Sequence, residues 1–93
     1  MTDRICRKRV LISGRVQGVG FRWYAHERAS SLGLSGWIRN LPDRMVEAVF
    51  QGEEALVDDM VEWCRRGSPA ASVKSVTVRD EPVSHAERGF SVE

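Results

Sequence analysis

A glycine-rich segment followed by an arginine is the part of this sequence whose residue types are best suited to chemistry. Residues 14–20 read Gly-Arg-Val-Gln-Gly-Val-Gly, and Arg22 follows directly after Phe21. The glycines allow the backbone to curl so that several N–H groups point into one concavity, where they can bind a phosphate. The planar guanidinium of Arg22 can hold two phosphate oxygens at once. This pattern therefore predicts a site for a small phosphorylated ligand.

The spacing of this segment excludes two common nucleotide-binding loops. No Gly-Lys-Ser or Gly-Lys-Thr follows it, so it is not a P-loop, and its glycines do not match the dinucleotide-binding fingerprint. A glycine-rich turn can also serve only to let a strand pack against a helix. On this segment alone, a phosphate site and a purely structural turn both stay open.

The neighbouring elements place the segment at the start of a helix. Residues 8–13 are rich in β-branched residues and are followed by Gly14, which predicts a strand. From Phe21 onward the apolar residues follow helical spacing, and Gly33 is well placed to end this helix. The N–H groups at a helix start lack intrahelical partners, and the helix dipole is positive there. The predicted loop, residues 14–20, is therefore a suitable place for an anion.

The rest of the chain predicts a sheet and a second helix. Strands are expected at residues 35–40, 45–51, 73–79 and 89–93. Between the second and third of these lies a helix, with Glu53 and Glu54 in its first turn and Arg65 and Arg66 in its last. The order β-α-β-β-α-β plus a short C-terminal strand indicates an α+β, ferredoxin-like split βαβ fold. We expect two helices on one face of a mixed, mainly antiparallel sheet, in a single domain over residues 1–93.

Charge is unevenly distributed along the chain. The formal net charge is only +1, which argues against a general nucleic-acid-binding protein. Residues 1–30 carry a net charge of +5, so the remainder carries −4. A positive end around the glycine-rich segment suits an anionic ligand, whereas the basic residues from Arg4 to Arg9 are expected to be a solvated tail. Residues 1–7 are expected to be a short, polar, frayed start.

Cellular location is predicted from what the sequence lacks. No stretch approaches the roughly 20 apolar residues of a membrane helix, and no apolar segment typical of a secretory signal follows the basic N-terminus. Cys6 and Cys64 form no CxxC pair; two free thiols in a reduced compartment are the simple interpretation, and a disulfide between them stays open. Cys64 lies on the apolar stripe of the second helix and is expected to be inert. We expect a cytoplasmic monomer with no membrane or nucleic-acid partner.

Longer motifs resemble the acylphosphatase family. Residues 14–22 (Gly-Arg-Val-Gln-Gly-Val-Gly-Phe-Arg) are followed, at the spacing of that family, by residues 36–40 (Gly-Trp-Ile-Arg-Asn). The similarity continues with Asp43, Val46-Glu47, Gly52 and the closing Gly-Phe-Ser-Val of residues 89–92. It therefore spans nearly the whole chain, and the fold of that family is the one predicted above from periodicity.

The resemblance implies an activity and a set of site residues. Acylphosphatases hydrolyse acyl phosphates, and their phosphate-binding loop matches Arg15, Val16, Gln17, Gly18, Val19, Gly20 and Phe21. The phosphate-binding arginine of the family matches Arg22, and its water-positioning asparagine matches Asn40. One departure is Arg44, at a turn position where the family usually carries glycine. If that turn needs a left-handed backbone, a non-glycine residue costs on the order of 1 kcal/mol.

Hydrolysis of an acyl phosphate needs few catalytic groups. The leaving carboxylate is stable without protonation at neutral pH, so no general acid is required. Phosphoryl transfer then depends on positioning and on positive charge around the phosphoryl oxygens. The amide of Asn40 can hold a water but is not a strong base, so we infer that a phosphate oxygen of the substrate accepts the proton of the water. His26 and His85 show no metal-ligand spacing, and no metal or cofactor is expected.

The sequence leaves several interpretations open. His26 either borders the site or is a solvated helix residue, and Trp23 either covers the edge of the site or only packs. The same fold serves RNA-recognition modules, although the first predicted strand lacks the aromatic residues on which bases stack. A binding domain that recognises phosphate without turnover is a further alternative. The presence of both Arg22 and Asn40 favours an enzyme.

Overall fold

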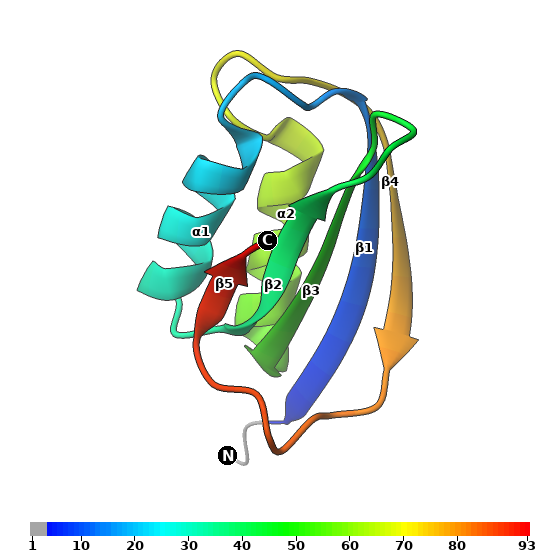
Figure 1. Cartoon of the computed structure of the whole chain (residues 1–93). Coiled ribbons are helices and arrows are strands. Elements are labelled where there is room, and N and C mark those ends of the chain that lie inside the picture. The colour runs from blue at the N-terminus through cyan, green and yellow to red at the C-terminus, as the bar shows by residue number, and fades with distance from the viewer. Residues whose placement is uncertain (1–3) are drawn as a thin grey trace.

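Two helices and five strands make up the described part of the chain. The computed structural model describes residues 4–93. In chain order the elements are β1 (Ile5–Arg15), α1 (Phe21–Ser31), β2 (Ser35–Asn40), β3 (Val46–Glu53), α2 (Glu54–Arg66), β4 (Ser72–Glu81) and β5 (Phe90–Val92). The sheet order is β4-β1-β3-β2-β5 (Figure 1). Among the strands of residues 4–93, only β2 and β5 pair in parallel, so the predicted mixed, mainly antiparallel sheet is confirmed.

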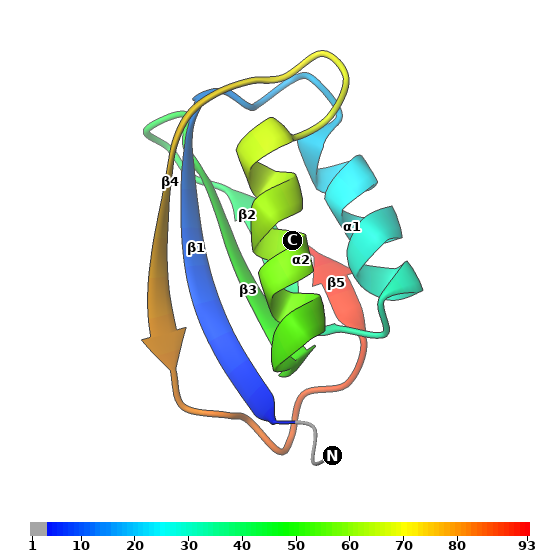
Figure 2. The ribbon, with the colours of Figure 1, turned by 180° about the vertical axis from the view of Figure 1, so that it is seen from behind.

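Both helices cover the same face of the sheet. Figure 2, seen from behind, shows α1 and α2 in front of the strands. α2 buries the apolar stripe predicted for it, which consists of Val57, Met60, Val61 and Cys64. On β1, an interior strand of the sheet, Val10 and Ile12 are fully buried under the helices, because alternate residues of a strand face the same side. The expected α+β arrangement, with two helices on one face, is therefore confirmed.

β1 is longer than its sequence pattern predicts. It begins at Ile5 and ends at Arg15, whereas the pattern predicts only residues 8–13. The frayed start expected over residues 1–7 is therefore wrong for residues 5–7, and residues 1–3 lie outside the described part of the chain. The physical reason is pairing on both sides, since β1 lies between β3 and β4 and gains ladder hydrogen bonds that its own sequence does not reveal.

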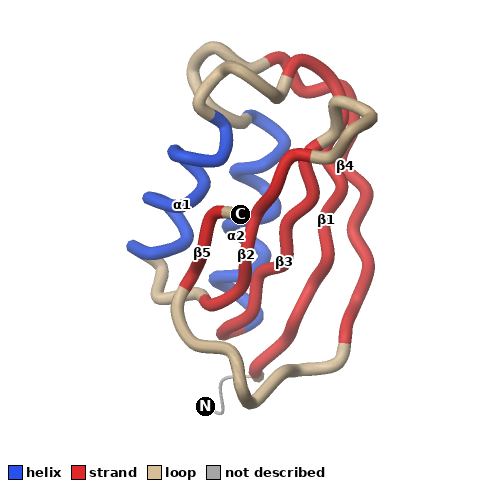
Figure 3. Tube along the Cα trace, viewed as in Figure 1, coloured by secondary structure: helices blue, strands red, loops and turns tan. Residues whose placement is uncertain are grey.

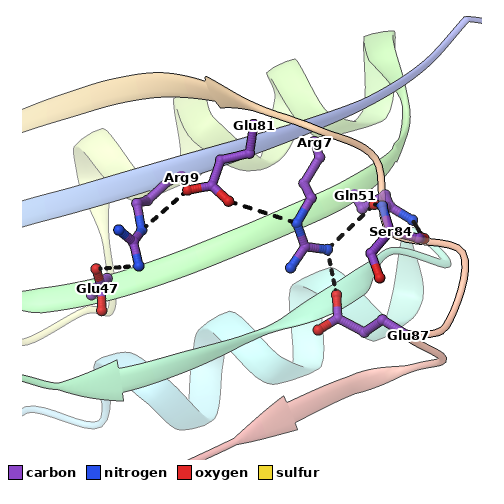
Figure 4. A network of polar contacts seen from close by, with 7 residues as sticks. All are labelled: Arg7, Arg9, Glu47, Gln51, Glu81, Ser84 and Glu87. Carbon is purple, nitrogen blue, oxygen red and sulfur yellow. Dashed lines mark hydrogen bonds and ion pairs between the residues drawn. The ribbon is translucent and has the colours of Figure 1, made fainter.

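The basic residues of β1 do not form a solvated tail, which corrects the prediction made for them. Arg9 Nη2 lies 3.1 Å from Glu47 Oε2, and Lys8 Nζ lies 3.1 Å from Asp58 Oδ1. Arg7 contacts Glu81 and Glu87, as Figure 4 shows. Each partner is distant in sequence, so the pairing becomes visible only when the sheet is assembled.

Side chains of β1 and β3 also bind the segment that leads to β5. Residues 82–89 connect β4 at one edge of the sheet to β5 at the other edge (Figure 3). The side chain of Gln51 on β3 donates to the Ser84 carbonyl at 2.8 Å and accepts from the Ser84 N–H at 2.8 Å (Figure 4). The ion pair of Arg7 with Glu87 adds a second attachment. These contacts on the side of the sheet away from the helices help to place β5 next to β2.

The turn between β2 and β3 contains a strained backbone position. Among residues 4–93, Arg44 is the one non-glycine residue with a positive φ, at 73°. The turn is closed by bonds from Leu41 N–H to the Met45 carbonyl at 2.8 Å and from Arg44 N–H to the Leu41 carbonyl at 3.2 Å. The resemblance to the acylphosphatase family implies a glycine at this turn position, and the left-handed backbone found here is a conformation that glycine adopts without strain.

We expect Arg44→Gly to stabilise the fold relative to Arg44→Ala. Both variants remove the side chain, but alanine keeps the left-handed strain and glycine relieves it. The free energy of unfolding, measured by urea denaturation, should be higher in the glycine variant by about 1 kcal/mol. Equal stability of the two variants would show that this backbone position carries no strain in solution.

Candidate active site

A cavity of about 360 Å³ opens where the glycine-rich loop, the start of α1, the end of β2 and β5 meet. Its lining consists of Val16, Gly18, Gly20, Phe21, Arg22, Trp23, Asn40 and Val92. Val16 and Phe21 are each only 1 % exposed and form the buried floor, whereas Asn40 is exposed at the mouth. The structure therefore brings Arg22 and Asn40, which are far apart in sequence, to one cavity.

The backbone of the loop is shaped by glycines in left-handed conformations. Gly18 has φ 72° and Gly20 has φ 74°, values that side-chain-bearing residues rarely adopt. Gly20 is also the residue preceding the first turn of α1, and it supplies no side-chain cap. The first turn contains no acidic residue either. The positive end of the α1 dipole is therefore left without a negative partner from its own first turn.

Three hydrogen bonds attach the loop to neighbouring segments, one through the Val19 carbonyl and two through the Gln17 side chain. The Ser68 hydroxyl, from a residue that is only 3 % exposed, donates to the Val19 carbonyl at 2.9 Å. The Gln17 side chain donates to the carbonyls of Leu41 at 2.8 Å and Met45 at 2.9 Å. Within residues 4–93, no hydrogen bond uses the N–H groups of residues 16–20 as donors. These N–H groups are thus available to an anion.

These contacts separate the roles of the predicted loop residues. The side chain of Gln17 points to the β2–β3 turn rather than into the cavity, so any part it takes in binding comes from its backbone N–H. Ser68 was not singled out by its sequence context, which carries no signal for a contact with a loop so far away. Phe21 anchors the start of α1, because its ring packs edge-on against Trp63 with centroids 5.3 Å apart.

Arg22 is oriented by Glu93, the residue that follows β5. Its Nη1 donates to the backbone oxygen of Glu93 at 2.8 Å. Glu93 is itself held by its N–H, which donates to the Ile38 carbonyl of β2 at 2.8 Å. The hydrogen bond to Glu93 fixes the position of the guanidinium. Because a guanidinium has five N–H donors, others remain for a ligand.

Asn40 occupies the last position of β2. It pairs with Val46 of β3, so its backbone is fixed by the antiparallel ladder. Its side-chain amide makes no hydrogen bond to any group within residues 4–93 and lines the same cavity as Arg22. An amide in that state can both donate to and accept from a bound water.

Arg15, another predicted loop residue, lies beside this cavity rather than in it. It lines a neighbouring depression of about 490 Å³ together with Gln17 and Arg44. Its guanidinium forms no ion pair within residues 4–93, so it adds positive potential near the loop.

Of four other side chains from the sequence analysis, His26, Trp23, Cys6 and Cys64, the cavity lining includes Trp23 alone. His26 does not line the cavity; its Nδ1 lies 3.7 Å from the Glu27 carboxylate on a half-exposed side of α1. Trp23 does line it, so the structure favours the interpretation in which this residue covers the edge of the site.

Cys6 and Cys64 are both free thiols, and burial raises the pKa of the Cys64 thiol well above its usual range. Cys64 is therefore unreactive at neutral pH, as expected.

Within residues 4–93, no three His, Cys, Asp or Glu side chains are grouped so that they could hold a metal ion. Neither α1 nor α2 is long and apolar enough to span a membrane.

Comparison with known proteins decides the family. The sequence model of the family described as Acylphosphatase matches residues 8–92. The chain belongs to the acylphosphatase family. It is 58 % identical to an acylphosphatase of Rubrobacter xylanophilus over 92 % of this chain and 78 % of that protein. The resemblance found in residues 14–22 and 36–40 is thereby confirmed.

Solved acylphosphatase structures share this fold. The crystal structure of acylphosphatase from Bacillus subtilis matches with a TM-score of 0.90 and 32 % identity, over 97 % of this chain and 99 % of that one. An acylphosphatase from Coxiella burnetii matches with a TM-score of 0.90 and 35 % identity, over 96 % and 93 %. Membership of this enzyme family sets aside the RNA-recognition alternative, which rested on the fold order alone.

Proposed function

We propose that this acylphosphatase-family chain hydrolyses acyl phosphates to a carboxylate and inorganic phosphate without a metal ion. The observation that carries the proposal is the single cavity shared by the glycine-rich loop, Arg22 and Asn40. Because the residues lining this cavity all come from one chain, we further propose that residues 1–93 act as one domain and as a monomer. We also expect the protein in the cytoplasm.

The phosphate group of the substrate is bound by the loop and by Arg22. The backbone N–H groups of residues 15–21 surround the phosphoryl oxygens, and the lack of internal acceptors for the N–H groups of residues 16–20 supports this role. The guanidinium of Arg22 binds two of these oxygens with donors that its bond to Glu93 leaves free. Both interactions become stronger in the transition state, when negative charge on the phosphoryl group is redistributed.

Asn40 holds the attacking water. The water oxygen forms a bond to phosphorus while the bond between phosphorus and the acyl oxygen breaks, and the carboxylate leaves with the electron pair of that bond. The proton of the water moves to a phosphoryl oxygen, because Asn40 is no base and the carboxylate needs no proton at neutral pH. This assignment is supported by the free amide of Asn40 at the mouth of the cavity.

Gln17 is a positioning residue in this scheme. Its side chain bridges the loop to the turn that directly follows Asn40, with hydrogen bonds of 2.8 and 2.9 Å. We expect Gln17→Ala to lower kcat by about tenfold, because the loss of two hydrogen bonds loosens the turn relative to the loop. The inhibition constant of inorganic phosphate should stay nearly unchanged. A weaker phosphate affinity with an unchanged kcat would instead place the side chain of Gln17 in the phosphate site.

The proposed function is tested by following hydrolysis of benzoyl phosphate with a metal chelator present. Turnover that resists the chelator supports a metal-free mechanism at this site. Turnover that disappears with the chelator and returns with added metal would overturn that part of the proposal. A folded protein that binds inorganic phosphate but hydrolyses neither benzoyl nor acetyl phosphate would favour the alternative of a binding domain without turnover.

A further inference from the structure

The mouth of the cavity carries two apolar side chains that phosphate binding does not use. Trp23 follows Arg22 on α1 and is 61 % exposed, and Val92 on β5 is 45 % exposed. Both line the cavity that contains Arg22 and Asn40. We call Trp23 and Val92 the apolar rim. The other lining residues at the mouth are Gly18, Gly20 and Asn40, which have no apolar side chain to offer.

Trp23 is held in place although it is exposed. Its indole packs edge-on against Tyr24, with ring centroids 5.0 Å apart and an interplanar angle of 89°. Tyr24 in turn lies against the loop, because a Cβ atom placed on Gly20 would be 3.6 Å from its ring. A single exposed aromatic residue needs no explanation on a protein surface. An exposed indole supported by a second ring, at the edge of the cavity that contains Arg22 and Asn40, is better explained by contact with a ligand.

We propose that the apolar rim contacts the acyl group of the substrate, so that the protein prefers acyl phosphates with aromatic or other large apolar acyl groups. This inference rests on the proposed function. With the phosphate bound by the loop and Arg22, the floor of the cavity is closed by Val16 and Phe21. The acyl group must then extend through the mouth, where Trp23 and Val92 offer apolar surface. An aryl group stacks on the indole, whereas an acetyl group is too small to cover it.

The proposal is tested by replacing Trp23 with alanine and measuring benzoyl phosphate and acetyl phosphate side by side. We expect KM for benzoyl phosphate to rise by about tenfold, because stacking and apolar burial are lost. KM for acetyl phosphate and the inhibition constant of inorganic phosphate should change by less than about twofold, since neither ligand reaches the indole. Trp23→Phe should restore most of the benzoyl phosphate affinity. Trp37→Ala is the matched control, because Trp37 lies under Arg39 with 5.1 Å between the guanidinium carbon and the ring centroid, and is not among the residues that line the cavity.

Binding measurements separate this proposal from the proposed function. Benzylphosphonate and methylphosphonate are not hydrolysed, so calorimetric titration compares their affinities even if the wild-type protein shows no turnover. The proposal predicts tighter binding of benzylphosphonate, with the difference lost in Trp23→Ala. Equal affinities in the wild type would overturn the apolar rim without affecting the hydrolysis assay. Equal losses of both phosphonates and of inorganic phosphate in Trp23→Ala would also overturn it, because they would show that Trp23 only supports the shape of the loop.

Discussion

Arg22→Lys is expected to lower kcat/KM for benzoyl phosphate by about 100- to 1,000-fold, the usual cost of losing a donor that stabilises transition-state charge. A lysine ammonium is one compact charge and cannot bind two phosphoryl oxygens in the planar geometry of a guanidinium. It also cannot easily keep the bond to the Glu93 oxygen, which is 2.8 Å long in the wild type, while facing the phosphate. The lysine variant therefore loses both the planar two-point binding of the phosphoryl oxygens and the hydrogen bond that orients the side chain.

Two controls make this result specific to Arg22. Arg28→Lys changes an exposed arginine near the other end of the same helix and should leave kcat/KM unchanged. Circular dichroism and thermal unfolding of Arg22→Lys should show a folded protein, since the core under α1 is formed by Phe21, Ala25 and Ala29. Nearly normal turnover in a folded Arg22→Lys protein would show that the guanidinium is not the phosphate ligand.

Asn40→Ala is expected to lower kcat by about 100-fold, because the attacking water loses its positioning group. The inhibition constant of inorganic phosphate should stay within about twofold of the wild-type value, since binding by the loop and Arg22 is untouched. Steady-state kinetics with inorganic phosphate as the competing ligand measures both quantities in one experiment. A variant with normal kcat and weak phosphate binding would make Asn40 a ligand of the phosphate instead.

A carboxylate at the same position tests where the proton goes. Asn40→Asp introduces a possible base beside the water, but it also introduces a negative charge beside the phosphoryl group. If the substrate itself accepts the proton, Asn40→Asp should be at least as impaired as Asn40→Ala. Higher activity than the wild type would argue for a base at this position. Ser35→Ala at the other end of β2 is the control for changes in the strand itself, and it should behave as the wild type does.

Elements with a strong local pattern were predicted closely from the sequence. β2 was expected at residues 35–40 and is found there. α2 runs from Glu54 to Arg66, close to its prediction, although Glu53, which was expected in its first turn, is the last residue of β3. Helical spacing and capping are local properties, so a single sequence carries them. The extent of β1 and the pairing of its basic residues were mispredicted, because both depend on strands and carboxylates that are distant along the chain.

The proposed site residues came from the sequence alone, by two routes. Residue types at a short, local spacing indicate an anion site at the glycine-rich loop and Arg22, whereas Asn40 was assigned through the resemblance to the acylphosphatase family. Only the tertiary structure decided which way the other side chains point. It turned Gln17 toward the β2–β3 turn, placed Ser68 behind the loop, and brought Trp23 and Val92 to the mouth of the cavity. These placements depend on the distances between elements that meet only after folding, and no local pattern in a sequence encodes such distances.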